Sequence, residues 1–292
     1  DNMNKKIKTF TIIGMFLLTS IMSISVTGIE TKSNLKMTGT TIDVYPEDGS
    51  NPIQDAIDQS SDGDTIFIHS GTYNIGREIG DIYKALIIKR PINGLKIIGQ
   101  DPIKTIINAH GADVITVDSP GIENIEISHL TIRSLEKDPD IYGVYGINVV
   151  VGDNIKIHNN IIDIGEQSPT VADTTYGIYL GADASDCQVY NNDLMCHYSP
   201  AKDIGSGNCW HDNFYVNYQD ECDEAYDTDL NGIIDEPYDK KGVYDQRPKY
   251  DPYILGRPTP PTISGPTNSK ARETVKYTVS CHSVPGTKVF LD

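Results

Sequence analysis

The chain has 292 residues, of which 38% are hydrophobic and 22% are charged, a mixture typical of globular rather than disordered proteins. Its 41 acidic and 24 basic residues give a formal net charge of −17, which repels nucleic-acid phosphates and anionic lipid headgroups. We therefore expect no nucleic-acid partner. The 17 tyrosines, against 5 phenylalanines and 1 tryptophan, indicate extended half-exposed surfaces, because the phenol ring seeks a polar partner at one end.

Residues 1–30 are interpreted as a signal peptide, with Asp1 and Asn2 lying before the start methionine. Three lysines precede an apolar run from Phe10 to Val26, and small residues end the run. The run is almost long enough to span a bilayer, so an uncleaved membrane anchor is the alternative. In both cases we expect the rest of the protein to be secreted or held at the cell surface, with this segment as the only contact with the membrane.

Five cysteines are present, at Cys187, Cys196, Cys209, Cys222 and Cys281. No CxxC pair occurs, which argues against a zinc ribbon or a thioredoxin motif. If one disulfide forms, Cys209 and Cys222 are the pair that flanks a single loop.

The middle of the chain repeats one strand pattern at intervals of 30 to 32 residues. The copies begin at Leu95, Ile125, Ile155 and Cys187, with an earlier strand at 66–68 and a degenerate copy at Cys209. A second strand recurs at 114–117, 146–149 and 177–180, and no helix-length amphipathic stretch separates the strands. The repeats therefore predict a coil of parallel strands with six turns.

In such a coil, equivalent residues of neighbouring turns stack on each other. The register predicts a buried column of Leu95, Ile125, Ile155 and Cys187, a second buried column of Ile97, Ile127, Ile157 and Val189, and an exposed column of Lys96, Glu126, Lys156 and Gln188. It also predicts a side-chain amide ladder from Asn159 to Asn191. Residues 51–57 carry a capping asparagine, a proline at the first helical position and one apolar face, so we expect a short helix that covers the first edge of the coil.

Residues 44–74, VYPEDGSNPIQDAIDQSSDGDTIFIHSGTYN, resemble the entry to right-handed parallel β-helix proteins of the pectin-lyase-like superfamily. The Asn-Ile-x-Ile-x-x-Asn repeats resemble its NosD-like branch, which includes carbohydrate-binding and sugar-hydrolysing proteins. The resemblance spans residues 42–255 and implies an all-β fold, a right-handed parallel β-helix (solenoid) over 31–255 with an N-terminal capping helix. Because this architecture carries lyases, hydrolases, epimerases, adhesins and inert scaffolds, the resemblance alone gives no activity.

An acidic loop matches most of the D-x-[DN]-x-[DN]-G calcium pattern. The expected oxygen ligands are Asp227, Asp229, Asn231, the backbone carbonyl of Ile233, and Asp235. Tyr238 stands where a bidentate glutamate is expected, so a regulatory EF-hand is not predicted, and Glu236 or Asp239 could supply the missing oxygens. The alternative is a solvated acidic turn. The loop belongs to residues 208–255, which resemble the closing element of NosD-like β-helices, with Trp210, Tyr238, Tyr250 and Tyr253 as aromatic members.

Catalytic residues are less well supported, and we assign none. His129 and Arg133 fall on one predicted turn, and Asp163 and Asp193 occupy nearby positions in successive copies, so these four are weak candidates. The Gly-His-Gly and Arg-Ile-Lys pattern of galacturonan hydrolases is absent from the sequence. A solvated ladder is the alternative to an active site. The cysteines and histidines form no compact cluster with the ligand spacing of a copper site.

Residues 256–261 form a proline-rich linker. Residues 262–292 resemble the start of an immunoglobulin-like module, with strands expected at 274–280 and 288–291, so a truncated β-sandwich module is predicted after the solenoid.

These observations favour a polysaccharide-binding protein, or an envelope scaffold or adhesin module, that is stabilised by structural Ca²⁺ and is a monomer. The sugar site is expected at four tyrosines near the second strand, because aromatic rings stack on the apolar faces of sugars. They are Tyr142, Tyr145, Tyr176 and Tyr179. The expected partner is a polysaccharide or cell-envelope glycan. The alternative is a polysaccharide lyase or glycoside hydrolase that uses the region of Asp163 and Asp193.

Overall fold

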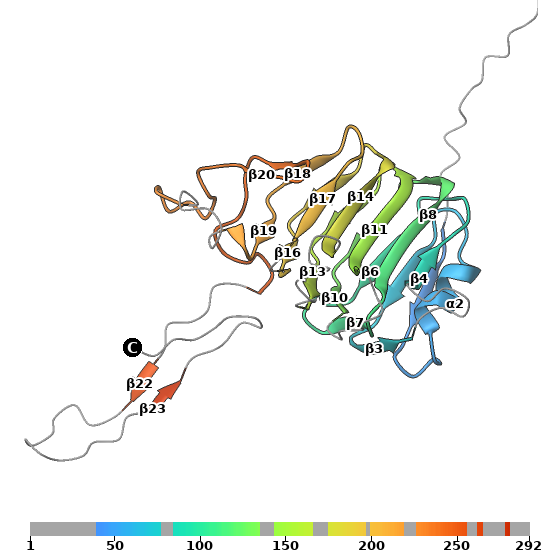
Figure 1. Cartoon of the computed structure of the whole chain (residues 1–292). Coiled ribbons are helices and arrows are strands. Elements are labelled where there is room, and N and C mark those ends of the chain that lie inside the picture. The colour runs from blue at the N-terminus through green and yellow to red at the C-terminus, as the bar shows by residue number, and fades with distance from the viewer. Residues whose placement is uncertain are drawn as a thin grey trace, which may run out of the picture. The chain divides into compact units, whose positions relative to one another are not determined.

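The computed structural model describes residues 39–76, 84–134, 143–165, 175–196, 199–218 and 226–255, and two short strands at 262–264 and 278–280. Where the chain is described it forms a parallel β-solenoid of about four turns with one short helix. Strands of successive turns lie side by side along the coil (Figure 1). The predicted signal peptide and most of the predicted β-sandwich module lie outside the described residues.

Three sheets form the walls of the solenoid. Sheet A contains, in spatial order, β1 (Thr41–Val44), β2 (Thr65–Ile68), β6 (Lys96–Gly99), β9 (Glu126–Ser128), β12 (Lys156–His158), β15 (Gln188–Tyr190), β18 (Cys209–His211), β21 (Val243–Asp245) and β20 (Tyr238–Lys240). Sheet B contains β3 (Gly71–Ile75), β7 (Thr105–Ala109), β10 (Thr131–Ser134), β13 (Ile161–Ile164), β16 (Asp193–Leu194) and β19 (Phe214–Tyr215). Sheet C contains β4 (Lys84–Ile88), β8 (Asp113–Glu123), β11 (Tyr145–Asp153), β14 (Tyr176–Ser185) and β17 (Ala201–Asp203), and β5 (Ile92–Asn93) pairs with β8.

The predicted register is confirmed in sheet A. Ile97 pairs with Ile127, Ile127 with Ile157, and Ile157 with Val189, and all four side chains are buried. The column that begins at Leu95 and ends at Cys187 is buried as well. In the column that the sequence predicts to be exposed, Glu126 and Lys156 are only half-exposed. The six strands that the sequence predicts as copies are successive neighbours in this sheet. The last copy, which begins with β18, has no described strand in sheet C, so the described residues show fewer than six complete turns.

A ladder of buried side-chain amides runs along the turn between sheets A and B. Its members are Asn160, Asn192 and Asn213, one residue later than the predicted Asn159 and Asn191. The two predicted residues instead have positive φ angles of 55° and 54°, which asparagine tolerates better than most residues. They shape the turn, and the next residue turns its amide inward.

The predicted capping helix is α2 (Pro52–Gln59), and it covers the first edge of sheet C. The Asn51 side chain caps its N-terminus by accepting the Gln54 N–H. The buried Gln54 side chain then acts as a substitute strand: its Oε1 accepts the Ile87 N–H at 2.8 Å, and its Nε2 donates to the Ile87 carbonyl at 3.1 Å. The backbone groups of Ile87 are thereby paired on the side of β4 where no further described strand lies.

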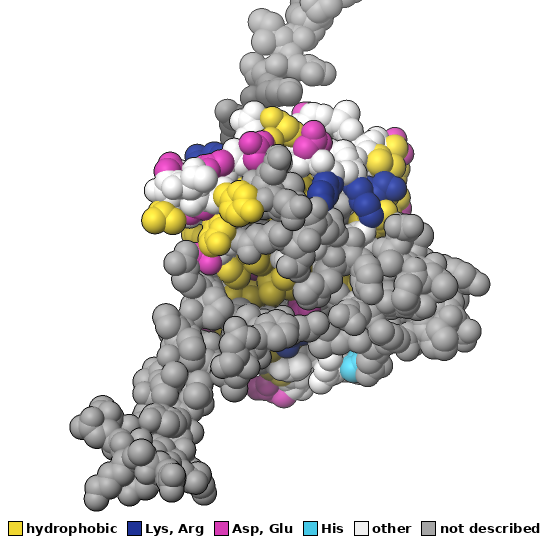
Figure 2. Space-filling model, turned by 60° about the vertical axis from the view of Figure 1, so that its left-hand side comes forward, with side chains coloured by type: hydrophobic (Ala, Val, Ile, Leu, Met, Phe, Trp, Pro, Cys, Tyr) yellow, Lys and Arg dark blue, Asp and Glu magenta, His cyan; other side chains and the backbone are white. Residues whose placement is uncertain are grey.

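The C-terminal end of the coil is covered by the antiparallel hairpin of β20 and β21, and β21 continues sheet A next to β18. Tyr238 is buried and stacks on Tyr215, with ring centroids 3.8 Å apart. Trp210 is also buried, whereas Tyr253 is 54% exposed. Apolar and acidic side chains lie next to each other on the surface seen in Figure 2. The hairpin, with the buried Tyr238, therefore packs against the last strand copy of sheet A, which carries the buried Trp210.

Beyond the solenoid, β22 (Thr262–Ser264) and β23 (Thr278–Ser280) form an antiparallel pair. The strand expected at 288–291 lies outside the described residues, so the β-sandwich module stays a prediction. Within the described part of the chain, no helix is long and apolar enough to cross a membrane.

Candidate functional site

Three of the four tyrosines predicted to bind sugar lie together on the outer face of sheet C. The rings of Tyr145 and Tyr176 are parallel, with centroids 5.9 Å apart. The Tyr179 ring lies 5.2 Å from that of Tyr145 and 5.8 Å from that of Tyr176. Tyr176 is buried, whereas Tyr145 and Tyr179 are half-buried, so the latter two offer ring surface to a ligand. Tyr142 lies outside the described residues.

Two glycines follow the first tyrosine of each strand. A Cβ atom on Gly146 would lie 2.5 Å from the Gly177 carbonyl oxygen of the next turn, and one on Gly177 would lie 2.5 Å from the Pro200 carbonyl oxygen. Neither position therefore has room for a side chain.

Two lysines lie over the tyrosine rings. The Lys202 ammonium is 5.4 Å from the centre of the Tyr176 ring and 6.0 Å from that of Tyr179. Lys241 lies 5.1 Å from the same Tyr176 ring, and its Nζ donates to the Ser199 hydroxyl. Cation–π attraction holds both ammonium groups next to the aromatic cluster. In a chain with a net charge of −17, this is a local concentration of positive charge.

Polar side chains on β8 and β11 lie next to the three tyrosines. The Asp113 carboxylate accepts the Tyr145 N–H at 2.9 Å and the Asn148 amide N–H at 3.2 Å. Burial, together with the nearby Asp113 charge, raises the pKa of Tyr145 to about 12, so its phenol is a neutral hydroxyl at physiological pH. Thr116 Oγ1 and Asn148 Oδ1 are buried without a hydrogen-bond partner. Neither oxygen is accessible to a ligand on the surface, because Thr116 is 0% and Asn148 7% exposed.

Of the weak catalytic candidates, Arg133 and Asp163 pair with each other. They are directly opposite on β10 and β13, with Arg133 Nε 3.2 Å from Asp163 Oδ2. His129 lies elsewhere, on the turn before β10, with its ring centroid 6.0 Å from that of His158. Burial lowers the pKa of His158, although the neighbouring Glu126 acts in the opposite direction.

Asp193 does not join Asp163 in an acidic cluster. It is in register with Ile161 on one side and Phe214 on the other, and its side chain is fully buried. Its carboxylate accepts the backbone N–H groups of three consecutive residues, 253 to 255, at 2.6, 2.9 and 2.9 Å. Asp193 therefore holds the chain in place where it leaves the solenoid. The structure does not bring the four weak candidates together.

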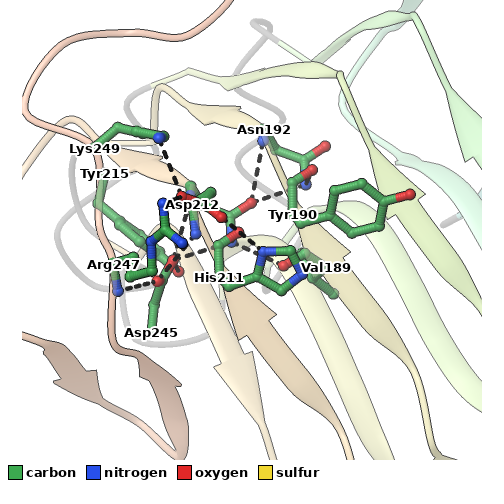
Figure 3. A network of polar contacts seen from close by, with 10 residues as sticks. Val189, Tyr190, Asn192, His211, Asp212, Tyr215, Asp245, Arg247 and Lys249 are labelled. Carbon is green, nitrogen blue, oxygen red and sulfur yellow. Dashed lines mark hydrogen bonds and ion pairs between the residues drawn. The ribbon is translucent and has the colours of Figure 1, made fainter. Parts of the chain in front are cut away.

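A network of polar side chains lies at the C-terminal end of the solenoid, and the sequence analysis did not predict it (Figure 3). His211 Nδ1 lies 2.9 Å from Asp212 Oδ2, and Lys249 Nζ lies 3.1 Å from Asp212 Oδ1. Burial acts to raise the pKa of Asp212, but the hydrogen bonds from His211 and Lys249 and the positive charges of Lys249 and Arg247 outweigh it and lower the pKa. Next to this group, Asp245 is fully buried and ends the amide ladder by accepting the N–H groups of Asn213.

The predicted calcium loop is tightly turned around Asp227. That carboxylate accepts the N–H groups of Asn231 and Gly232, at 3.0 and 2.8 Å. The Asp229 carboxylate accepts from the Asn231 side chain at 2.9 Å, whereas Asp235 is turned to the hydroxyl and N–H of Thr228. Ile233 donates its N–H to Asn231 Oδ1. Within the described residues, no group of three or more His, Cys, Asp and Glu side chains is arranged to hold a metal ion.

The donors in this loop are hard oxygens, the type that Ca²⁺ prefers, and three of the five expected ligands lie within one turn. Asp235 accepts hydrogen bonds from Thr228, and calcium binding stays a prediction. The suggested Cys209–Cys222 disulfide also stays a prediction, since Cys209 is exposed and Cys222 lies outside the described residues.

Comparison with known proteins gives distant matches to solved structures. Pectin methylesterase in complex with a hexasaccharide aligns at 15% identity and a TM-score of 0.33, over 62% of this chain and 56% of that one. Pectin methylesterase PemA from Erwinia chrysanthemi aligns at 17% identity and a TM-score of 0.33, over the same shares. A mutant of the PL6-family alginate lyase AlyGC aligns at 11% identity and a TM-score of 0.25, over 60% of this chain and 35% of that one.

The aligned part of this chain thus covers only about half of the esterases. No protein-family model and no curated protein matches the sequence. The assignment of the fold rests on the strand pairing described above.

Proposed function

We propose that the protein is an exported β-solenoid that binds polysaccharide on the outer face of sheet C. The observation that carries the proposal is the cluster of Tyr145, Tyr176 and Tyr179, whose ring centroids lie within 5.9 Å of each other. Aromatic rings stack against the apolar faces of sugars.

The same geometry favours binding over catalysis. Glycoside hydrolysis needs two carboxyl groups on either side of the scissile bond. Asp163 is paired with Arg133, and the Asp193 carboxylate is occupied by three backbone N–H groups. We further propose that Ca²⁺ stabilises the acidic loop at the C-terminal end, with Asp227, Asp229 and Asn231 as side-chain ligands and a structural rather than a catalytic role.

The test is a polysaccharide-binding series by glycan array and calorimetry, with wild type, Tyr145→Ala and Tyr179→Ala. Each substitution removes ring surface, and we expect a loss of affinity of about tenfold, a value at the low end of the roughly 1–3 kcal/mol per ring known for nucleic-acid bases stacked on aromatic side chains. Tyr244→Ala is the matched control, because Tyr244 is 50% exposed on β21 and belongs to no such cluster.

A reducing-sugar assay and the absorbance of unsaturated products are followed in the same samples. Unchanged affinity in both tyrosine variants would contradict the proposed site. Turnover of a bound polysaccharide would favour the lyase or hydrolase alternative.

A further inference from the structure

A small apolar patch on the outer face of sheet B is separate from the main core. Ile161, Met195 and Phe214 form it, and each is at most 8% exposed. They are covered in part by Ile254 and Leu255, which lie near the end of the described solenoid. Asp193 lies in the middle of this patch, between Ile161 and Phe214 in one column of sheet B.

A single carboxylate thus ties this end of the chain to sheet B. Asp193 is 0% exposed and accepts three consecutive backbone N–H groups, those of Tyr253, Ile254 and Leu255. A buried carboxylate placed in an apolar patch is unusual, because desolvation of the charge is costly unless hydrogen bonds offset it. Here the offset comes from backbone amides of a segment 60 to 62 residues further along the chain.

We propose that Tyr253–Leu255 form a releasable strap that the Asp193 carboxylate holds on sheet B. Whether the strap is bound or released determines the last residue at which the chain is attached to the solenoid. With the strap closed, the anchor is Leu255. With the strap open, the next backbone hydrogen bond to the solenoid is that of the Tyr250 N–H to the Gly232 carbonyl, at 3.1 Å. Release would free about five residues, or roughly 17 Å of extended chain, ahead of the proline-rich stretch 256–261.

The equilibrium between the closed and the open strap depends on pH, because the Asp193 carboxyl is buried only in the closed state. Burial raises the pKa of Asp193 to about 6, and the three backbone hydrogen bonds oppose this shift. When the strap is open the carboxyl is exposed, and its pKa returns to about 3.9. The closed state therefore binds a proton more tightly, so the strap is held more firmly at pH 5 and loosens as the pH rises through 6.

Other ionisable groups around Asp193 do not explain such a response. On β13, Asp163 is paired with Arg133, and next to β19 Lys249 is paired with Asp212. The Cys196 thiol, which follows β16, is neutral because burial raises its pKa to about 12. The segment leading into the strap carries Asp251 and the exposed phenol of Tyr253.

Hydrogen exchange of the strap amides tests the proposal, with rates corrected for intrinsic exchange at each pH. From pH 5 to pH 7.5, we expect the wild-type protection of residues 253–255 to fall about tenfold, the factor that pKa values of about 6 and 3.9 give. Asp193→Asn removes the titration, and the protection of its strap amides should be the same at both pH values. Asp183→Asn, which alters an exposed carboxylate on β14, is the control and should behave as wild type.

The Ile161 amide, which donates to Leu130 within the solenoid, reports whether each variant is folded. If Asp193→Asn does not fold, Ile254→Ala removes part of the apolar cover instead, and should raise exchange in the strap while the Ile161 amide is unchanged. The proposal is overturned if strap and Ile161 amides exchange at one common rate, because the strap then opens only with the whole fold. Strap protection that does not change with pH in wild type would also overturn it.

Discussion

At the scale of single residues, three successive turns each contribute a buried asparagine, Asn160, Asn192 or Asn213, whose polar contacts an apolar side chain cannot make. Asn192 is fully buried, and its Oδ1 accepts both the backbone and the side-chain N–H of Asn160. Its Nδ2 donates to the carbonyl of Ile157 in the preceding turn, at 3.0 Å. Each ladder residue therefore satisfies backbone groups that the tight turn leaves unpaired inside the coil.

Replacing Asn192 with alanine should destabilise the fold by about 3 kcal/mol, because several buried donors and acceptors lose their partners at once. Asn74→Ala is the matched control: Asn74 is exposed and accepts one hydrogen bond from Asn108, so its loss should be under about 1 kcal/mol. Urea unfolding of the three proteins measures the difference. Equal stability of the two variants would show that the buried amide ladder contributes no more than the exposed hydrogen bond between Asn108 and Asn74.

At the scale of elements, the strands could be predicted from the sequence and the turns only in part. Apolar residues at a fixed interval determine which strands stack, which is why the column from Ile97 to Val189 is in the expected register. Asparagine is common both at positive φ and as a buried ladder, so spacing alone does not separate Asn159 from Asn160. The role of Asp193 depends on contacts about 60 residues away, which no local pattern contains.

The acidic loop is the element where charge should matter most. If Ca²⁺ binds there, the free energy of unfolding should rise by about 2.7 kcal/mol when calcium is at a hundredfold excess over its Kd. Thermal unfolding in EDTA and in millimolar CaCl₂ measures the effect in wild type and in Asp227→Ala with Asp229→Ala. Asp183→Ala, outside the loop, is the control for the loss of a surface charge.

We expect the shift in wild type and the control, and not in the double variant. A full shift in the double variant would place the metal elsewhere. No shift in wild type would leave the loop as an acidic turn, held by the contacts of Asp227 and Asp235.

At the scale of the whole molecule, a coil of parallel strands must end without leaving open edges, since such an edge pairs with other chains. At the C-terminal end, the hairpin of β20 and β21 extends sheet A beyond β18. At the N-terminal end, α2 lies against β4, and Arg90 donates to the carbonyl of Ile57 near the end of the helix. Sheet A is thus extended by a hairpin at its C-terminal end, whereas the first strand of sheet C is covered by a helix whose polar side chain pairs with the strand edge.

Gln54 tests how the N-terminal end is closed, because its amide pairs with both backbone groups of Ile87. Gln54→Ala should lower the free energy of unfolding by about 1–3 kcal/mol, since the Ile87 N–H and C=O are left buried without partners. It should also promote association through the opened edge of β4, seen as a concentration-dependent shift in size-exclusion chromatography. Gln59→Ala, on the exposed side of the same helix, should change stability by less than about 0.5 kcal/mol and remain unassociated. If the two variants behave alike, the apolar face of α2 closes this edge without help from Gln54.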